Sequence, residues 1–235
     1  MFRPCERGEG RLSEDELSEL IRDCPVLYHM AAAGSWPSIR QHGLWGTTAL
    51  LDLFEVTGDA RRALEARRPA SVEIRHARLG RAVIRDQKPM SDRSLLACLE
   101  DGLSPADWYA ILNAHAFFSL TRSRLLRMLN AGSYREAAHD VIEADTASLV
   151  AAHRGRIRLS AINSGFAQRH AVPRGRSTFS PIADYPYAAW RRKRARGERV
   201  VELAVTPGVP DMAAHTRRVV RMRGGDELET LWTRD

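Results

Sequence analysis

The stretch CPVLYHMAAAGSWPSIRQHGLW, residues 24–45, contains the pattern that decides the fold. The apolar run after its proline predicts a short strand that finishes on His29. Small residues follow and indicate a tight turn. A short helix is predicted next, because Ser35 can cap its start, Pro37 stands in its first turn and Gly43 can end it. An ionisable ring at the end of this strand, directly before a turn of alanines and glycine, indicates that something lies against the turn.

Short strands and helices alternate irregularly along the rest of the chain. We expect helices at residues 13–24, 35–43, 47–56, 59–68, 91–100, 104–115, 121–132, 146–153 and 187–197. We expect strands at residues 26–30, 80–87, 116–120, 139–145, 156–160, 198–209, 217–223 and 228–232. This order predicts an α+β fold rather than a doubly wound sheet. We expect one domain over residues 1–235, with an N-terminal helix within residues 1–24 packed on it. The loop over residues 163–186 is long enough to have a function of its own.

Basic residues exceed acidic ones, and nearly all of them are arginine. The chain has 36 Lys and Arg against 29 Asp and Glu, for a net charge of +7, and only Lys88 and Lys193 are lysine. Planar guanidinium groups suit phosphates and base edges, which favours a nucleic-acid or nucleotide partner. A basic face that only keeps the protein in solution is the alternative.

Several classes of protein are disfavoured by what the sequence lacks. No apolar run approaches the roughly 20 residues that cross a bilayer, and the charged N-terminus does not read as a signal peptide, so we expect a cytoplasmic protein with no membrane partner. The three cysteines, Cys5, Cys24 and Cys98, have neither zinc-ligand spacing nor a disulfide pattern. Phosphate loops and the common metal-binding motifs are absent. We therefore expect no metal.

The opening stretch resembles the first motif of ADP-ribosyltransferases related to the DarT toxins and, more distantly, to the tRNA 2′-phosphotransferases. In that superfamily a strand ends in a histidine, and a small-residue turn and a short helix follow. The resemblance implies that His29 contacts the ribose of NAD. It implies that the backbone of Met30 and Ala31 holds the nicotinamide amide. A histidine satisfied within the core is the alternative.

A second stretch, HAFFSLTRSRLLRML at residues 115–129, resembles the aromatic strand and Arg-containing turn of DarT-like enzymes. The resemblance implies that Phe117 or Phe118, of which we select Phe118, stacks on nicotinamide. It also implies that Arg122 or Arg124, of which we select Arg122, binds the pyrophosphate bidentately. An Asn-Pro pair common in that turn is Leu-Thr in this chain. The alternative for the aromatic pair is a plain core strand.

A third stretch, RVVELAVTPGVPDM at residues 199–212, places Glu202 in a strand. Alternation puts Leu203 and Val205 on one face and Glu202 on the other, where the carboxylate meets solvent or lines a cleft. DarT-like enzymes carry their catalytic glutamate in a similar strand, so the resemblance implies this role for Glu202. It also implies that Arg85, which lies between the first two motifs, orients NAD and the acceptor. An ion pair with Asp86 or another carboxylate is the alternative for Arg85.

Cationic residues gather between the second and third motifs, where the resemblance places acceptor selection. Binding to DNA or RNA phosphates is the function this charge predicts, and a solvated helix face is the alternative. The residues that we expect to contact nucleic acid are Arg174, Arg176, Arg191, Arg192, Lys193 and Arg194.

Together, the resemblances of the three motifs imply a single-domain ADP-ribosyltransferase-like split β-sheet with surrounding helices. The expected activity is NAD-dependent mono-ADP-ribosylation of DNA, RNA or a nucleotide, with NAD as a substrate. A toxin or defence role, with an antitoxin or immunity partner, belongs to the same resemblance. The alternatives are an NAD-dependent RNA 2′-phosphotransferase, a non-catalytic nucleic-acid-binding relative of the fold, and an enzyme that modifies a protein.

Overall fold

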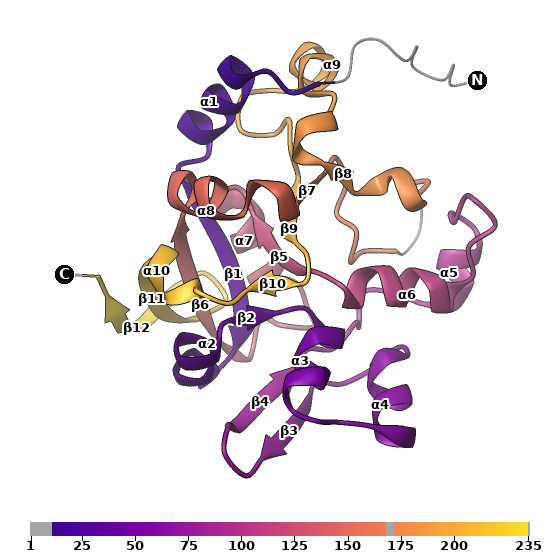
Figure 1. Cartoon of the computed structure of the whole chain (residues 1–235), viewed down its shortest axis with the longest axis vertical. Helices are drawn as coiled ribbons and strands as arrows, with labels where there is room; N and C mark the ends of the chain where they lie inside the picture. Colours follow the sequence, from indigo (N-terminus) through magenta and orange to yellow (C-terminus); the bar gives the residue numbers. More distant parts are fainter. Residues whose placement is uncertain (1–10, 168–171, 235) are drawn as a thin grey trace.

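Eight strands form one antiparallel sheet that runs through the centre of the molecule (Figure 1). The computed structural model describes residues 11–167 and 172–234. The strand order is β12-β11-β6-β1-β5-β9-β7-β8. In that order the strands are β12 (Asp226–Thr233), β11 (Thr216–Arg223), β6 (Ala138–Asp145), β1 (Val26–Ala32), β5 (Ala116–Ser119), β9 (Glu202–Val205), β7 (Ile157–Ser160) and β8 (Ser180–Pro181). Two small sheets pair β2 (Leu44–Trp45) with β10 (Gly208–Val209), and β3 (Val72–His76) with β4 (Gly80–Ile84).

Ten α-helices surround this sheet in the described part of the chain. They are α1 (Glu14–Asp23), α2 (Trp36–His42), α3 (Thr47–Leu53), α4 (Gly58–Glu65), α5 (Asp92–Leu96), α6 (Pro105–Asn113), α7 (Arg122–Leu129), α8 (Thr146–His153), α9 (Tyr187–Lys193) and α10 (Met212–His215). The α+β expectation is therefore confirmed, with strands β1, β5, β6, β7, β11 and β12 close to their expected positions.

Apolar side chains cover both faces of the sheet. On one face Leu27 of β1 packs in a core that Leu149 of α8 and Leu20 of α1 share. On the other face Met30 packs with Leu125 of α7. This division follows from the two-residue period of a strand, which sends Leu27 and Met30 to opposite sides. Burial on both faces explains why β1 reads as a nearly continuous apolar run.

A buried carboxylate holds the turn that follows β1. Asp140 of β6 is fully buried and accepts hydrogen bonds from the backbone N–H groups of Gly34, at 2.9 Å, and Trp36, at 3.2 Å. The guanidinium of Arg221 donates to the same carboxylate at 3.0 and 3.1 Å, so the buried charge is paired. Gly34 has a φ of +81°, which favours glycine. The turn is thus fixed by Asp140, and it begins α2 beside the end of β1.

The N-terminal helix contributes apolar residues to the main core. Ser13 and Glu16 form the capping box, and Leu17 and Leu20 are buried in the main core. Residues 1–10, and Cys5 with them, lie outside the described part of the chain.

Several strand predictions needed correction. The strand predicted to finish on His29 continues to Ala32, and the strand expected over residues 80–87 ends at Ile84. The strand expected over residues 198–209 begins only at Glu202 and is divided into β9 and β10. The strand β3, which pairs with β4, follows a segment rich in arginine and was not predicted. Because Val72 and Arg75 are both exposed, β3 lacks the regular alternation of apolar and polar residues that would have predicted a strand.

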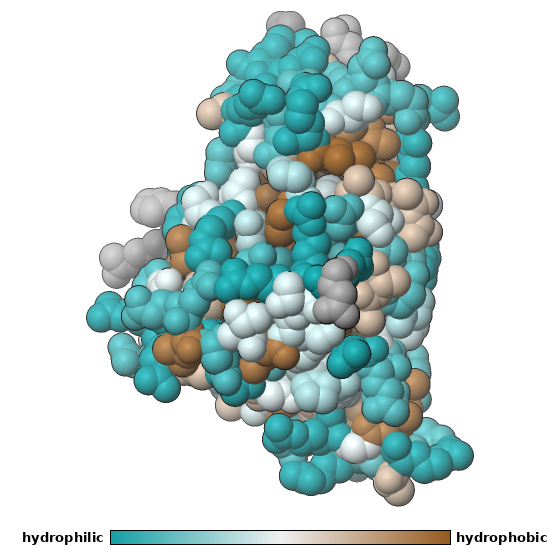
Figure 2. Space-filling view, turned by 90° about the vertical axis from the view of Figure 1, so that its left-hand side faces the viewer, coloured by the Kyte–Doolittle hydropathy of each residue, from teal (hydrophilic) through white to brown (hydrophobic). Residues whose placement is uncertain are grey.

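The described residues contain no helix that is long and apolar enough to cross a membrane. Figure 2 shows one face of the molecule, on which hydrophobic residues form small separate patches in a mostly hydrophilic surface.

Candidate functional site

One cavity of about 580 Å³ lies where β1, β5 and β9 meet. His29 of β1 and Glu202 of β9, which are far apart in the sequence, both line it. Arg85, Phe117 and Ser164 also line it. A volume of this size lies within the range of about 300–1,000 Å³ that is usual for small-molecule sites. The cavity is therefore the candidate functional site.

The imidazole of His29 is held in one tautomer. Its Nδ1 lies 2.8 Å from the carbonyl oxygen of Phe117, and because a carbonyl only accepts, Nδ1 carries the proton. The ring packs edge-on to Phe118, with centroids 5.9 Å apart. Burial lowers the pKa of His29 to about 4. The ring is thus neutral near pH 7, and its Nε2 is a hydrogen-bond acceptor rather than a cation.

The edge of β1 next to His29 has open backbone positions. β1 pairs with β6 along its whole length, but its register with β5 includes only Tyr28 opposite Ser119. Among the described strands, none therefore pairs with this edge beyond Tyr28. Met30 and Ala31 line the cavity here, although their side chains are buried. An unpaired strand edge offers N–H and C=O groups to a ligand amide.

Glu202 is a half-buried carboxylate that receives a directed hydrogen bond. The backbone N–H of Ser164 donates to its Oε2 at 3.1 Å. Burial raises the pKa of Glu202 to about 7, and the hydrogen bonds from Ser164 and the charges of Arg124 and Arg174 oppose this rise. The neighbours Leu203 and Val205 are in the main core, as the alternation predicts. Of the two surroundings that the sequence left open, Glu202 therefore faces a cleft.

Arg85 lies directly after β4 and belongs to a polar network on the cavity wall. Its Nη1 donates to Nδ1 of His139 at 3.3 Å, and its guanidinium lies over the ring of Tyr134, 5.3 Å from the centroid. The Tyr134 hydroxyl donates to Asp86 at 2.9 Å. Arg85 thus lines the cavity with an imidazole and an aromatic ring as its neighbours.

In the second motif, the structure favours Phe117 over Phe118 and Arg124 over Arg122 as the residues that a ligand in the cavity could reach. Phe117 and Phe118 both line the cavity, but Phe118 is 1% exposed and packs in the core behind His29, whereas Phe117 is half-buried and has the more accessible ring. Arg122 is not part of the cavity lining, and it pairs with Glu227 of β12 at 2.9 Å. Arg124 does line the cavity. Positions two residues apart in a helix differ by about 200° around the helix axis, so Arg122 and Arg124 point to opposite sides of α7.

Arg127 is a cavity residue that the sequence analysis missed. It follows Arg124 by three positions and therefore shares its helix face. Glu198 pairs with Arg124 and, at 3.6 Å, with Arg127. The repeated arginine in residues 122–127 was the signal for this pair, because its spacing shows which arginines lie together. Ser164 and Tyr134 gave no comparable signal, since only the folded chain brings them to the cavity.

Arg174 was wrongly assigned to the nucleic-acid surface. Its side chain is 2% exposed, so no phosphate reaches it in this conformation. Its guanidinium donates to the carbonyl oxygens of Ser164 and Val172, each at 3.1 Å, and lies over the ring of Trp108. Arg174 therefore fixes the loop that brings Ser164 to Glu202. Arg174 thus stabilises the candidate site without lining the cavity. Arg176 is exposed.

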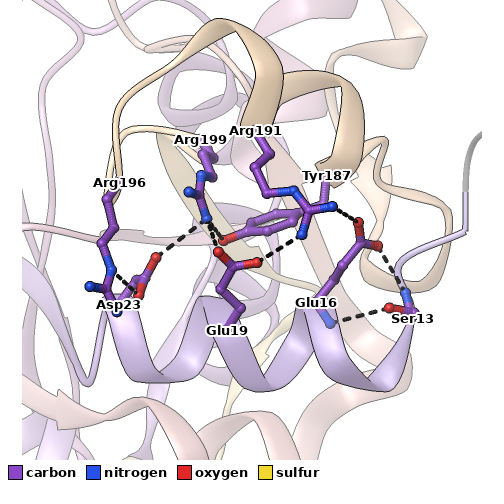
Figure 3. A network of polar contacts seen from close by, with 8 residues as sticks. All are labelled: Ser13, Glu16, Glu19, Asp23, Tyr187, Arg191, Arg196 and Arg199. Atoms are coloured by element: carbon purple, nitrogen blue, oxygen red, sulfur yellow. Dashed lines mark hydrogen bonds and ion pairs between the residues drawn. The ribbon is translucent and has the colours of Figure 1, made fainter.

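Arg191 of α9 and two arginines that follow this helix, Arg196 and Arg199, pair with the acidic face of α1 (Figure 3). Arg191 contacts Glu19 at 3.2 Å, and Arg199 pairs with both Glu19 and Asp23. The Tyr187 hydroxyl accepts from Arg199 at 3.0 Å in the same network. Arg191 therefore serves to attach α1 in this structure.

Two other basic residues at the end of α9 are arranged around an aromatic ring. The charged groups of Lys193 and Arg194 lie 5.7 and 4.1 Å from the centroid of Trp190. Arg192 and Lys193 are exposed, and Arg194 is half-buried. The cationic surface is thus smaller than the sequence indicates, with Arg176 and Lys193 among its members.

Residues 25–216 match a family of unknown function, DUF7002, and the chain belongs to that family. The matched range begins just before β1 and includes both His29 and Glu202. It leaves α1 outside. No curated protein and no solved structure matches the chain.

Proposed function

We propose that this protein is an NAD-dependent mono-ADP-ribosyltransferase that modifies a nucleic acid or a nucleotide. The observation that supports the proposal is the convergence of His29 and Glu202 on one cavity, with the open edge of β1 beside them. The fold would then be an ADP-ribosyltransferase-like split sheet, which the short contact between β1 and β5 supports.

The cavity residues fit NAD as a substrate. The neutral His29 offers an Nε2 lone pair to a ribose hydroxyl. The edge of β1 at Met30 and Ala31 that faces away from β6 has no described strand beside it and is complementary to a carboxamide, and Phe117 offers an aromatic surface. Arg124 and Arg127 offer charge to a pyrophosphate, although Glu198 already neutralises part of it. In this role Arg124 replaces Arg122.

Glu202 would stabilise the charge that develops during transfer. The bond between the ribose C1′ and the nicotinamide nitrogen breaks, nicotinamide leaves with the electron pair, and positive charge spreads over the ribose. A carboxylate hydrogen-bonded to the ribose 2′-OH stabilises this charge in a partly buried site. The acceptor nucleophile then bonds to C1′ and loses its proton to Glu202 or to water. Ser164 holds the carboxylate in place through its backbone N–H.

A nucleic-acid or nucleotide acceptor is supported by charge at the surface. Arg176 and Lys193 are exposed, and Phe166, which is 44% exposed, lines the cavity within the loop before β8. An exposed aromatic ring at a cavity that Arg124 and Arg127 also line suits an unpaired base. Arg85 lies on another part of the cavity wall, where it would orient the reactants.

The test is transfer of label from adenylate-labelled NAD to single-stranded DNA, duplex DNA, RNA and free nucleotides. We expect label on at least one of these acceptors with the wild-type protein and at least a 100-fold slower transfer with Glu202→Gln. Glu136→Gln, which removes a carboxylate that is 87% exposed, is the matched control and should retain the wild-type rate. Equal transfer by wild type and Glu202→Gln would refute the role of Glu202.

The same assay separates the alternatives. Dependence on a 2′-phosphorylated RNA, with removal of that phosphate, would identify a 2′-phosphotransferase. Binding of DNA or RNA without NAD binding or nicotinamide release would identify a non-catalytic relative. Label on a protein in place of nucleic acid would change the acceptor class.

A further inference from the structure

A second cluster of chemically active side chains lies outside the cavity, where the end of α8 meets α10. The Nε2 atoms of His153 and His215 are 3.2 Å apart. The two carboxylate oxygens of Asp211 lie 2.7 Å from His153 Nε2 and 3.2 Å from His215 Nε2. Three donor groups from two different segments thus converge on one point.

The distances within the cluster are those of a small coordination shell. Around a tetrahedral ion with bonds of about 2.0–2.1 Å, neighbouring ligand atoms are about 3.3 Å apart. The separation of the two Nε2 atoms, 3.2 Å, already fits, and the Asp211 oxygen that lies 2.7 Å from His153 needs to move away by about 0.6 Å. We propose that His153, Asp211 and His215 bind a divalent first-row transition ion, with Zn²⁺ as the leading candidate.

The donor set and its exposure support this class of ion. Two imidazoles and one carboxylate suit zinc and its neighbours, whereas Ca²⁺ and Mg²⁺ prefer oxygen ligands alone. His153 and His215 are 5% and 4% exposed, so their rings are fixed by the surrounding core. The side chain of Asp211 is 48% exposed and leaves a path for the ion and for a water ligand.

The Nδ1 atoms of the two histidines, which face away from the cluster, have different hydrogen-bond partners. Ser148 Oγ lies 2.6 Å from Nδ1 of His215. When Oγ accepts this hydrogen bond, Nδ1 carries the proton and Nε2 has a lone pair for the ion. Nδ1 of His153 accepts instead from the guanidinium of Arg156. Coordination through Nε2 requires a proton on Nδ1 of His153, so Arg156 must turn away when the ion binds. Arg156 is therefore a competitor of the metal, and this sets a specific test.

A metal at this place would act as a structural clip. Asp211 and His215 lie in the segment that follows β9, and His153 ends α8. The same segment contains β10, whose partner β2 carries Leu44 and Trp45 of the cavity wall. The ion would thus hold the segment after Glu202 against α8. This inference is independent of the proposed transferase activity, because its test needs neither NAD nor an acceptor.

The experiment is titration of the metal-free full chain with Zn²⁺ by calorimetry, with thermal unfolding and Co²⁺ absorption as further readouts. We expect one ion per chain and a midpoint of unfolding higher by about 5–10 °C at a free Zn²⁺ concentration about 100-fold above Kd. We expect His215→Ala and Asp211→Asn to weaken Zn²⁺ binding at least 100-fold. His76→Ala, which removes a histidine 3.4 Å from a carboxylate elsewhere, is the matched control and should bind as the wild type does.

Arg156→Gln distinguishes a metal site from a purely hydrogen-bonded cluster. If the ion binds as proposed, this variant binds Zn²⁺ as tightly as the wild type or more tightly. The proposal is overturned if the wild-type chain shows neither Zn²⁺ binding nor a change in unfolding temperature. It is equally overturned if His215→Ala and Asp211→Asn, both folded by circular dichroism, bind Zn²⁺ like the wild type. Should His215→Ala fail to fold, Asp211→Asn and Arg156→Gln still decide the matter.

Discussion

Replacing Glu202 by glutamine should make the fold more stable at alkaline pH than the wild-type fold. Burial raises the pKa of Glu202 from its ordinary value of 4.5 to about 7. The folded protein therefore keeps a proton that the unfolded chain has already lost between these two pH values. Stability contributed by this group is present below about pH 4.5 and is lost as the pH rises through about 7. Glutamine, which is neutral throughout, does not carry this penalty.

The magnitude follows from the two pKa values. Their difference corresponds to at most about 3 kcal/mol at full ionisation, and because solvent reaches the cavity we expect less. Between pH 5 and pH 8 the wild type should lose about 2 kcal/mol relative to Glu202→Gln. In the proposed role of Glu202, this loss of stability would be an exchange of stability for activity.

Urea unfolding at pH 5, 6, 7 and 8 measures this difference directly. The free energy of unfolding of Glu202→Gln should exceed that of the wild type by an amount that grows with pH. Glu136→Gln is the control for removal of one negative charge from the surface. The reasoning is refuted if the difference between Glu202→Gln and wild type is independent of pH or shrinks as the pH rises.

Four further changes test other parts of the structure. Ser164→Ala keeps the backbone N–H but removes the side-chain hydrogen bond of Ser164 that also lowers the pKa of Glu202, so the acid limb of the pH profile of kcat/KM should move to higher pH; an unchanged limb contradicts this. Arg174→Met leaves the carbonyl oxygens of Ser164 and Val172 without their donor and should cost about 2–4 kcal/mol in urea unfolding, whereas a neutral result would show that the loop holds itself. Gly43→Ala should lower the free energy of unfolding by about 2–4 kcal/mol, because φ is +88° and a Cβ would lie 2.6 Å from the Pro210 backbone. Gly58→Ala is the control, with a positive φ but open space around it, and should lower it by only about 1 kcal/mol. Equal losses for the two variants would refute the steric argument. Glu19→Gln should lower the unfolding midpoint and increase DNA or RNA binding at low salt, since Arg191 and Arg199 lose a partner; unchanged binding would show that these arginines do not meet nucleic acid.

Local signals in the sequence predicted the elements that carry the candidate site. The apolar residues of the opening stretch form β1, in which Leu27 and Met30 are buried on opposite faces, and the caps at Ser35 and Gly43 bound α2. The alternation around Glu202 was enough to separate this side chain from the core residues Leu203 and Val205. These features depend on neighbours within a few residues, which a sequence displays directly.

Long-range pairing set the limit of prediction. Arg174 reads as a surface cation, but its burial depends on the carbonyl of Ser164 and the ring of Trp108, which only the folded loop brings near. Arg191 reads as part of a solvated basic face, and its partner Glu19 is in a helix at the other end of the chain. The assembly of His153, Asp211 and His215 has no motif spacing, because α8 and α10 meet only in the fold.

The most direct test of the central claim is calorimetric titration of NAD into the wild-type chain and two variants. We predict that the wild type binds NAD, that His29→Ala binds at least 10-fold more weakly, and that Glu202→Gln retains binding but releases nicotinamide at least 100-fold more slowly. Absence of NAD binding by the folded wild-type chain, or equal affinity in His29→Ala, would contradict an NAD site between His29 and Glu202.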